Sequence, residues 1–203
     1  MNIWREYSIR YPNDYFDYDG IVDEKRYAEQ KIKLLLVLKE TNDLENSLIN
    51  FLKQGGPGGG LKTWQPACKW IEAILDGTSD GTFATPEERK LMLRRIATMN
   101  LKKVSGEAKS DLGYIEWASG NEDLLLEQIN QINPNVIVLC CDKAGNDFIS
   151  SSVLGGINWL TYKQTELKYS KWNDKFVLHA RHPLFAPVAW RDYFIKFHND
   201  FLR

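Results

Sequence analysis

Residues 32–38 read Ile-Lys-Leu-Leu-Leu-Val-Leu, and this apolar run decides the fold class. It follows a polar segment and does not alternate between apolar and polar residues. A short run of this kind is typical of a parallel strand that is buried on both faces of a sheet. Residues 136–141 (Val-Ile-Val-Leu-Cys-Cys) and 176–180 (Phe-Val-Leu-His-Ala) have the same character, and residues 96–104 also read as a strand. The sequence therefore predicts four central strands.

Helix signals separate these strands. Thr85-Pro-Glu-Glu combines an N-cap residue, an early proline and first-turn acids, and it predicts a helix that runs to about Arg95. Apolar residues at helical spacing predict the other helices, over 66–76, from Ser119 or Asn121 to 132, over 143–151 and from Pro187 onward. This alternation predicts an α/β fold, a three-layer α/β/α sandwich around a mostly parallel four-stranded sheet.

Length and composition suit one globular domain. The chain has 203 residues, 43% of them apolar, with a formal net charge of −1. We expect a single domain over 1–203, in which residues 1–30 form an aromatic N-terminal arm. Such an arm either wraps the domain or offers stacking platforms for bases. Residues 55–60 (Gly-Gly-Pro-Gly-Gly-Gly) predict a mobile loop, not a phosphate-binding P-loop, because no Lys-Ser/Thr follows them.

The sequence also predicts several absences. The longest apolar run is too short to span a bilayer, and no secretory signal is visible. Three cysteines supply neither a disulfide framework nor a complete metal set. We therefore expect a cytoplasmic monomer without cofactor, metal or membrane partner. Residues 87–109 carry seven bases against three acids, which predicts either a phosphate-attracting patch or a solvated helix face.

Polar residues follow every predicted strand. The first strand leads into Lys39-Glu-Thr-Asn-Asp43, the second carries Asn100, the third leads into Cys141-Asp142 and the fourth into His179-Ala-Arg-His-Pro183. Ligands of such sheets bind beyond the carboxyl ends of the strands. The sequence therefore predicts a site at this edge.

Three of these segments carry a resemblance to a known family. They are Ile32–Asp43, the segment 131–140 in which Pro134 precedes a buried strand, and Val177-Leu-His-Ala-Arg-His-Pro-Leu184. Together they resemble the uracil-DNA glycosylase superfamily over about residues 30–203. The resemblance implies a divergent DNA glycosylase-like hydrolase that cleaves the N-glycosidic bond of a flipped, modified or deaminated base. It also implies DNA as the partner.

The resemblance assigns roles to individual residues. His182 would donate a hydrogen bond to the leaving base, and Glu40, Asn42 or Asp43 would hold the attacking water. Asn100 would read the base edge and Trp64 would stack on the base. The predicted nucleic-acid contacts are Lys102, Lys103, Arg181, Leu184 and Phe185, of which Leu184 and Phe185 would form a wedge that fills the gap left by the base.

The sequence also departs from the family pattern, and it leaves other functions open. Lys39 stands in place of a motif glycine, Asp43 in place of a proline, and Leu184 in place of a small residue after His-Pro. One alternative is a non-catalytic nucleic-acid or nucleobase-binding protein on the same fold. Another is a small-molecule enzyme that uses Cys141 or His179.

Overall fold

A computed structural model describes residues 2–41, 47–80, 84–106, 113–185 and 189–203. The strands are β1 (Gly20–Ile21), β2 (Leu34–Leu38), β3 (Ala97–Asn100), β4 (Val136–Leu139), β5 (Leu160–Thr161), β6 (Lys168–Trp172) and β7 (Lys175–His179). The helices are α1 (Ile3–Arg10), α2 (Glu24–Ala28), α3 (Leu48–Lys53), α4 (Leu61–Asp76), α5 (Pro86–Leu93), α6 (Gly113–Ser119), α7 (Glu122–Ile132), α8 (Lys143–Phe148) and α9 (Ala189–Phe201). Short helical turns cover η1 (Gly58–Gly60), η2 (Ile149–Val153) and η3 (Pro183–Phe185).

The strands form one mixed sheet in the order β1-β3-β2-β4-β7-β6-β5. Its centre consists of the four predicted strands, since β3, β2, β4 and β7 pair in parallel. The prediction of a mostly parallel sheet of four strands is wrong for the sheet as a whole, because β1, β6 and β5 extend it at its edges and all pair antiparallel. These edge strands have no continuous apolar run: β6 reads Lys-Tyr-Ser-Lys-Trp. Hydrophobic periodicity in the sequence therefore does not predict these edge strands.

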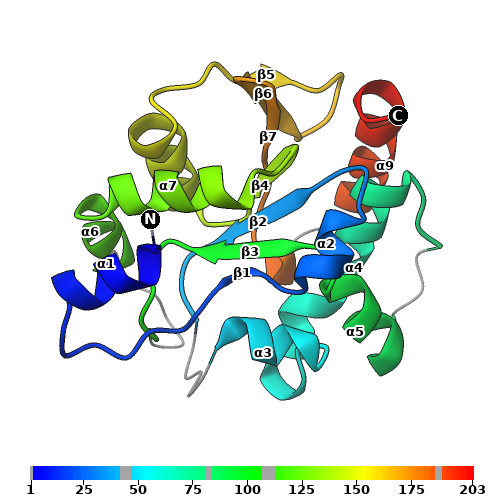
Figure 1. Cartoon of the computed structure of the whole chain (residues 1–203). Coiled ribbons are helices and arrows are strands. Elements are labelled where there is room, and N and C mark those ends of the chain that lie inside the picture. The colour runs from blue at the N-terminus through cyan, green and yellow to red at the C-terminus, as the bar shows by residue number, and fades with distance from the viewer. Residues whose placement is uncertain (1, 42–46, 81–83, 107–112, 186–188) are drawn as a thin grey trace.

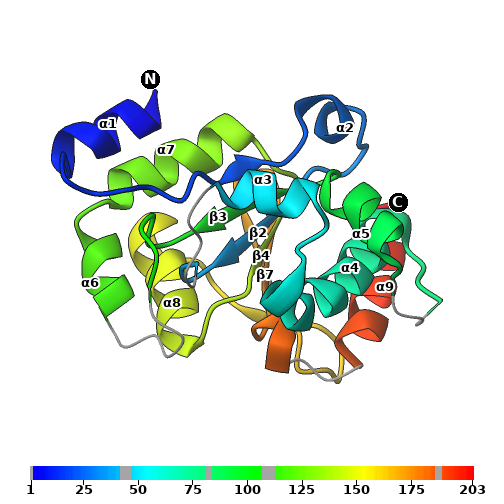
Figure 2. The same cartoon turned by 90° about the horizontal axis from the view of Figure 1, so that it is seen from below.

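Helices cover both faces of the sheet (Figures 1 and 2). Leu34, Leu36 and Leu38 of β2 pack with α3, α4, α5 and α9 on one face. Leu35 and Val37 pack with α6, α7 and α8 on the other face. All five side chains are buried, so β2 has the two-sided burial that its apolar run predicts.

Most helix predictions hold with shifted ends. Thr85 caps α5 in a full capping box with Glu88, as the sequence indicates. Helix α4 begins at Leu61, five residues before the predicted start, and contains Pro66. The prediction of an irregular loop at 55–60 is partly wrong, because Gly58–Gly60 forms a 3-10 turn that continues into α4. Helices α1, α2, α3 and α6 are not among the predicted ones, and Pro187 lies outside the described residues.

The N-terminal segment 1–30 is built into the fold. It contains α1, β1 and α2, and α1 contacts α7. The rings of Tyr7 and Tyr27 are buried, whereas Tyr15 is 95% exposed. The arm thus packs on the domain, as one of the two predicted alternatives requires, and the rings of Tyr7 and Tyr27 are buried in this packing.

Gly56 and Gly58 give a matched test of the packing under α4. Both have a left-handed φ, +61° and +60°, which costs an alanine about 1 kcal/mol. A Cβ on Gly56 would lie 2.8 Å from the Trp64 ring, whereas a Cβ on Gly58 would meet nothing within 4 Å. We expect Gly56→Ala to lower the free energy of unfolding by roughly 1–3 kcal/mol more than Gly58→Ala does. Equal losses in denaturant unfolding would show that Trp64 does not pack tightly on Gly56.

Candidate functional site

A cleft with a volume of about 1180 Å³ lies at the carboxyl ends of the parallel strands. Chain order explains its position. From β2 the chain adds β3 on one side and then crosses to add β4 on the other side. The loops after β2 and β4 therefore diverge and leave a crevice between them, which is where ligands bind in open α/β sheets. Residues after β2, β4 and β7 all line this cleft.

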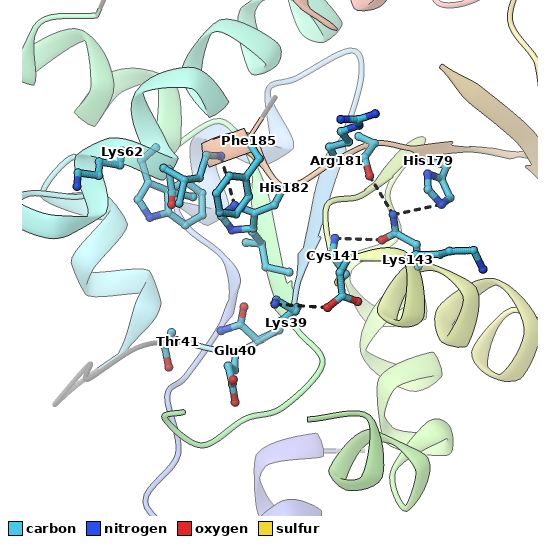
Figure 3. Close-up of a pocket in the computed structure, with 18 of the residues that line it drawn as sticks. Lys39, Glu40, Thr41, Lys62, Cys141, Lys143, His179, Arg181, His182 and Phe185 are labelled. Carbon is cyan, nitrogen blue, oxygen red and sulfur yellow. Dashed lines mark hydrogen bonds and ion pairs between the residues drawn. The ribbon is translucent and has the colours of Figure 1, made fainter. Parts of the chain in front are cut away.

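Lys39, Glu40 and Thr41 follow β2 and line the cleft (Figure 3). The Glu40 carboxylate lies 3.0 Å from the Lys102 ammonium, and its side chain is only 6% exposed. Gly106 packs on this carboxylate so closely that a Cβ would overlap it. Lys39 lies 3.5 Å from the Asp142 carboxylate, across the crevice between the ends of β2 and β4. These contacts fix Glu40 at the wall of the cleft.

Asn100 ends β3 and lines the same cleft. The residue is 1% exposed, yet its Nδ2 has no hydrogen-bond partner among the described residues. A buried amide without a partner costs about 1–3 kcal/mol, so such groups need an explanation. A ligand atom that accepts a hydrogen bond in the cleft would supply the missing partner.

His182 follows β7 and also lines the cleft. The backbone N–H of Leu184 donates to its Nδ1 at 3.3 Å. Burial, and next the charge of Lys39, lower the pKa of this imidazole to about 4. At neutral pH the ring is therefore uncharged, and because Nδ1 accepts, the proton resides on Nε2. The geometry leaves His182 as a neutral hydrogen-bond donor through Nε2.

Aromatic side chains form a wall of the cleft on the α3 and α4 side. Trp64 lines the cleft but is only 5% exposed, because most of its ring belongs to the core. Phe51 of α3 lies beside it and is partly buried. Sequence reasoning missed Phe51, since nothing predicted α3. A ligand that contacts this wall would therefore meet two aromatic rings, those of Trp64 and Phe51.

The other half of the cleft lies beyond the ends of β4 and β7. His179 packs edge-on against Trp159, and burial followed by the charge of Lys168 lowers its pKa. Cys141 is buried, and burial raises the pKa of its thiol well above the ordinary value. A thiol held in the protonated form is a poor nucleophile, which does not favour the cysteine alternative.

Asp142 connects this half of the cleft to Lys39. The Tyr114 hydroxyl and the Gly145 N–H both donate to the Asp142 carboxylate. Burial alone would raise the pKa of Asp142, but these hydrogen bonds and Lys39 outweigh it, so the pKa is lowered. Asp142 is therefore a fixed anion, and the sequence showed it only as a polar residue after a strand.

The rim of the cleft holds the predicted contact residues of the last loop. Leu184 and Phe185 are 42% and 73% exposed on η3. Arg181 is exposed and lies 3.4 Å from the Glu166 carboxylate. All three line the cleft, as Figure 3 shows for Arg181 and Phe185. The structure thus brings an apolar pair and a cation to one edge.

Two predicted contact residues, Lys102 and Lys103, are not free to bind a ligand. Lys103 has no exposed surface and pairs with Asp19, so the prediction that it contacts a nucleic acid is wrong. Lys102 is occupied by Glu40 and does not line the cleft. Asn42 and Asp43 lie outside the described residues. Glu40 is therefore the one predicted water-holding residue whose position is known.

The basic segment 87–109 has no free cationic patch in its described part. Arg89 is buried and donates to the Gly55 and Ala84 carbonyls. The remaining described cations also have partners: Lys90 pairs with Glu87, Arg94 with the Lys53 carbonyl, Arg95 with Asp76, Lys102 with Glu40 and Lys103 with Asp19. Sequence counting could not show that these charges are satisfied internally.

Positive charge gathers at the cleft instead. Its lining includes five cationic side chains and three carboxylates, an excess of two in a protein of net charge −1. The cations are Lys39, Lys62, Lys143, Lys168 and Arg181, and the carboxylates are those of Glu40, Asp142 and Asp147. A cleft of this balance favours an anionic ligand.

None of the described helices is long and apolar enough to cross a membrane. In the same part of the chain, no group of three or more His, Cys, Asp or Glu side chains could hold a metal ion. Comparison with protein-family models and with curated proteins found no match to this chain.

The lowered pKa of His182 predicts a pH-dependent stability. An unfolded histidine titrates near pH 6.5 and the folded one near pH 4, so only the unfolded chain binds a proton in between. Stability is therefore lost as pH falls through this window. After allowance for partial exposure, we expect wild type to lose about 2 kcal/mol more than His182→Gln between pH 7 and pH 4. Denaturant unfolding across this pH range measures the difference. Equal losses of stability in wild type and in His182→Gln would contradict the lowered pKa of His182.

Proposed function

We propose that the cleft binds a nucleobase of a DNA strand and hydrolyses its N-glycosidic bond, as a divergent relative of the uracil-DNA glycosylase superfamily would. One observation carries the proposal: Glu40, Trp64, Asn100 and His182, which come from four distant parts of the chain, line one cleft. The proposal is further supported by the buried Nδ2 of Asn100, which has no partner in the described structure.

The chemistry needs both a stabilised cation and a stabilised anion. Breaking the bond places positive charge on the sugar and negative charge on the departing base. The Nε2–H of His182 would donate to the base oxygen that gains charge, and its neutral state suits a donor that does not pay for a buried cation. Glu40 would orient the water that attacks the sugar and would stabilise the positive charge there.

Base recognition would come from Asn100 and the aromatic wall. The Nδ2 of Asn100 donates hydrogen bonds and does not accept them. It therefore favours a base edge that presents a carbonyl oxygen or a ring nitrogen as acceptor. Trp64 and Phe51 would contact the base face. The base oxygen that gains charge would then accept from His182, and the recognised edge of the base would accept from Asn100, so that two neutral donors hold the base.

The rest of the cleft suits a nucleic-acid strand more than a free base. Its volume of about 1180 Å³ exceeds the ~300–1,000 Å³ common for small-molecule sites. The excess of cations would attract phosphates, and exposed Leu184 and Phe185 would occupy the space that a flipped base leaves.

A second function, nucleobase binding without hydrolysis, is favoured by a different observation. The Glu40 carboxylate is ion-paired with Lys102 and is almost fully buried, which leaves it less free to hold water. A protein of this kind would bind the same strand through the same residues and release no base.

Release of free base separates these two functions. We expect wild type to release base from oligonucleotides that contain uracil or hypoxanthine, and His182→Ala to slow release about 10²–10³-fold through loss of one donor. His198→Gln is the control, since His198 lies on α9 outside the cleft and bonds the Ile74 carbonyl. Binding without release from a broad panel of damaged bases would establish the non-catalytic function. Absence of both binding and release would reject the proposal.

A substitution of Asn100 gives a sharper test, because oligonucleotide binding and folding stability should change in opposite directions. Asn100→Leu removes a buried amide without a partner, so it should raise the free energy of unfolding by about 1 kcal/mol while binding of the uracil oligonucleotide is lost.

Thr98→Val is the matched control for this variant. Thr98 lies on the same face of β3, and its buried Oγ1 also has no partner among described residues, but it does not line the cleft. The valine should leave binding unchanged and keep or raise the stability. If Asn100→Leu binds the oligonucleotide as tightly as wild type does, Asn100 is not part of the binding site.

A further inference from the structure

Behind Asn100 lies an ion pair that the proposed chemistry does not use. The side chains of Asp19 and Lys103 have no exposed surface, and Lys103 Nζ lies 2.8 and 3.1 Å from the two Asp19 carboxylate oxygens. Gln128 of α7 donates to Asp19 at 2.6 Å and accepts from Lys103 at 2.7 Å. Burying two charges is costly, and such pairs often add little to stability. The presence of this pair is therefore better explained by groups that it holds in position than by a gain in stability.

The pair holds both backbone polar groups of Asn100. The Asn100 N–H donates to Asp19 at 2.6 Å, and the Asn100 carbonyl accepts from Lys103 Nζ at 2.7 Å. Strand β1 pairs with β3 only at Ala97 and Thr98. Beyond that point the ion pair takes the place of a neighbouring strand, so the last residue of β3 is fixed on its open side.

Asp17 makes a similar contact with the other wall of the cleft. Its carboxylate accepts hydrogen bonds from the hydroxyls of Thr41 and Ser105, and its N–H donates to the Lys103 carbonyl at 2.8 Å. Thr41 follows Glu40, and the Thr41 carbonyl accepts from the Gly106 N–H at 2.8 Å. Gly106 is the residue that packs on the Glu40 carboxylate. One short segment of the chain therefore touches the supports of both Glu40 and Asn100.

We infer that residues 17–19 of the N-terminal segment position the cleft, with Asp19 and Lys103 fixing Asn100 and Asp17 fixing the loop that carries Glu40. Asp17, Asp19 and Lys103 do not line the cleft, so they act through these residues and do not touch a ligand. The inference rests on the proposed function, because it assigns the fixed atoms to nucleobase recognition. It places an essential part of the site in a segment that the sequence marks only as an aromatic arm.

Three variants separate positioning from stability. Asp19→Asn and Lys103→Met each leave one buried charge without its partner, so each should be less stable than wild type. The double variant Asp19→Asn/Lys103→Met buries no charge and should be more stable than either single variant. It still lacks the ammonium that holds the Asn100 carbonyl. We expect all three to bind the uracil oligonucleotide about 10- to 100-fold more weakly than wild type.

Asp23→Ala is the control for the same N-terminal segment. Asp23 caps α2 by accepting from the Arg26 N–H and does not line the cleft. The alanine should lower thermal stability and leave the affinity for the oligonucleotide unchanged. A purely structural role for Asp19 and Lys103 predicts instead that affinity follows stability, so that the double variant binds more tightly than the single ones.

Hydrogen exchange of the Asn100 backbone amide gives a readout that needs no ligand. We expect this amide to exchange faster in the double variant than in wild type, while the amides of β2 and β4 keep their relative protection. Unchanged exchange at Asn100, or wild-type affinity of the double variant, would overturn the inference. If wild type itself does not bind the oligonucleotide, the proposed function fails, and the exchange rates alone decide whether the pair holds Asn100.

Discussion

The parallel pairing of β3, β2, β4 and β7 is the constraint on which the rest of the structure depends. Parallel pairing brings the carboxyl ends of four strands to one edge, although the residues that follow them are far apart in the chain. The crossing of the chain from β3 to β4 then opens the crevice between the ends of β2 and β4. Glu40, Asn100 and His182 meet because of this topology and not because of any local motif.

The cleft divides its residues into those that face a ligand and those that hold them. Asn100 and His182 each present a neutral donor, and Glu40 presents a carboxylate. The groups behind them carry the charges: Lys102 holds Glu40, and Asp19 with Lys103 holds Asn100. A fixed ion pair behind Asn100 and a backbone N–H behind His182 keep these two neutral donors oriented, which is the arrangement that electrostatic preorganisation requires.

Sequence reasoning predicted the centre of the fold better than its edges. The runs at β2 and β4 are buried on both faces and apolar throughout, and β7 has an apolar centre, so all three stand out in the sequence. Strands β1 and β5 have only two residues each and β6 is mixed in polarity, and the pairing of all three depends on neighbours that a local pattern does not show. The same limit applies to the site. The polar strand ends led to Glu40, Asn100 and His182, but the burial of Lys103 follows from an ion pair across 84 residues, which no local count of charges can detect.

A structure of the protein in complex with a DNA oligonucleotide would show whether the cleft binds a nucleobase. A DNA oligonucleotide with one 2′-fluoro-2′-deoxyuridine would resist hydrolysis, because the fluorine destabilises positive charge on the sugar. We expect the uracil ring to lie in the cleft, with its acceptor atoms within hydrogen-bonding distance of Asn100 Nδ2 and His182 Nε2. An oligonucleotide that binds elsewhere on the protein, with no contact to either atom, would show that the cleft does not bind the base.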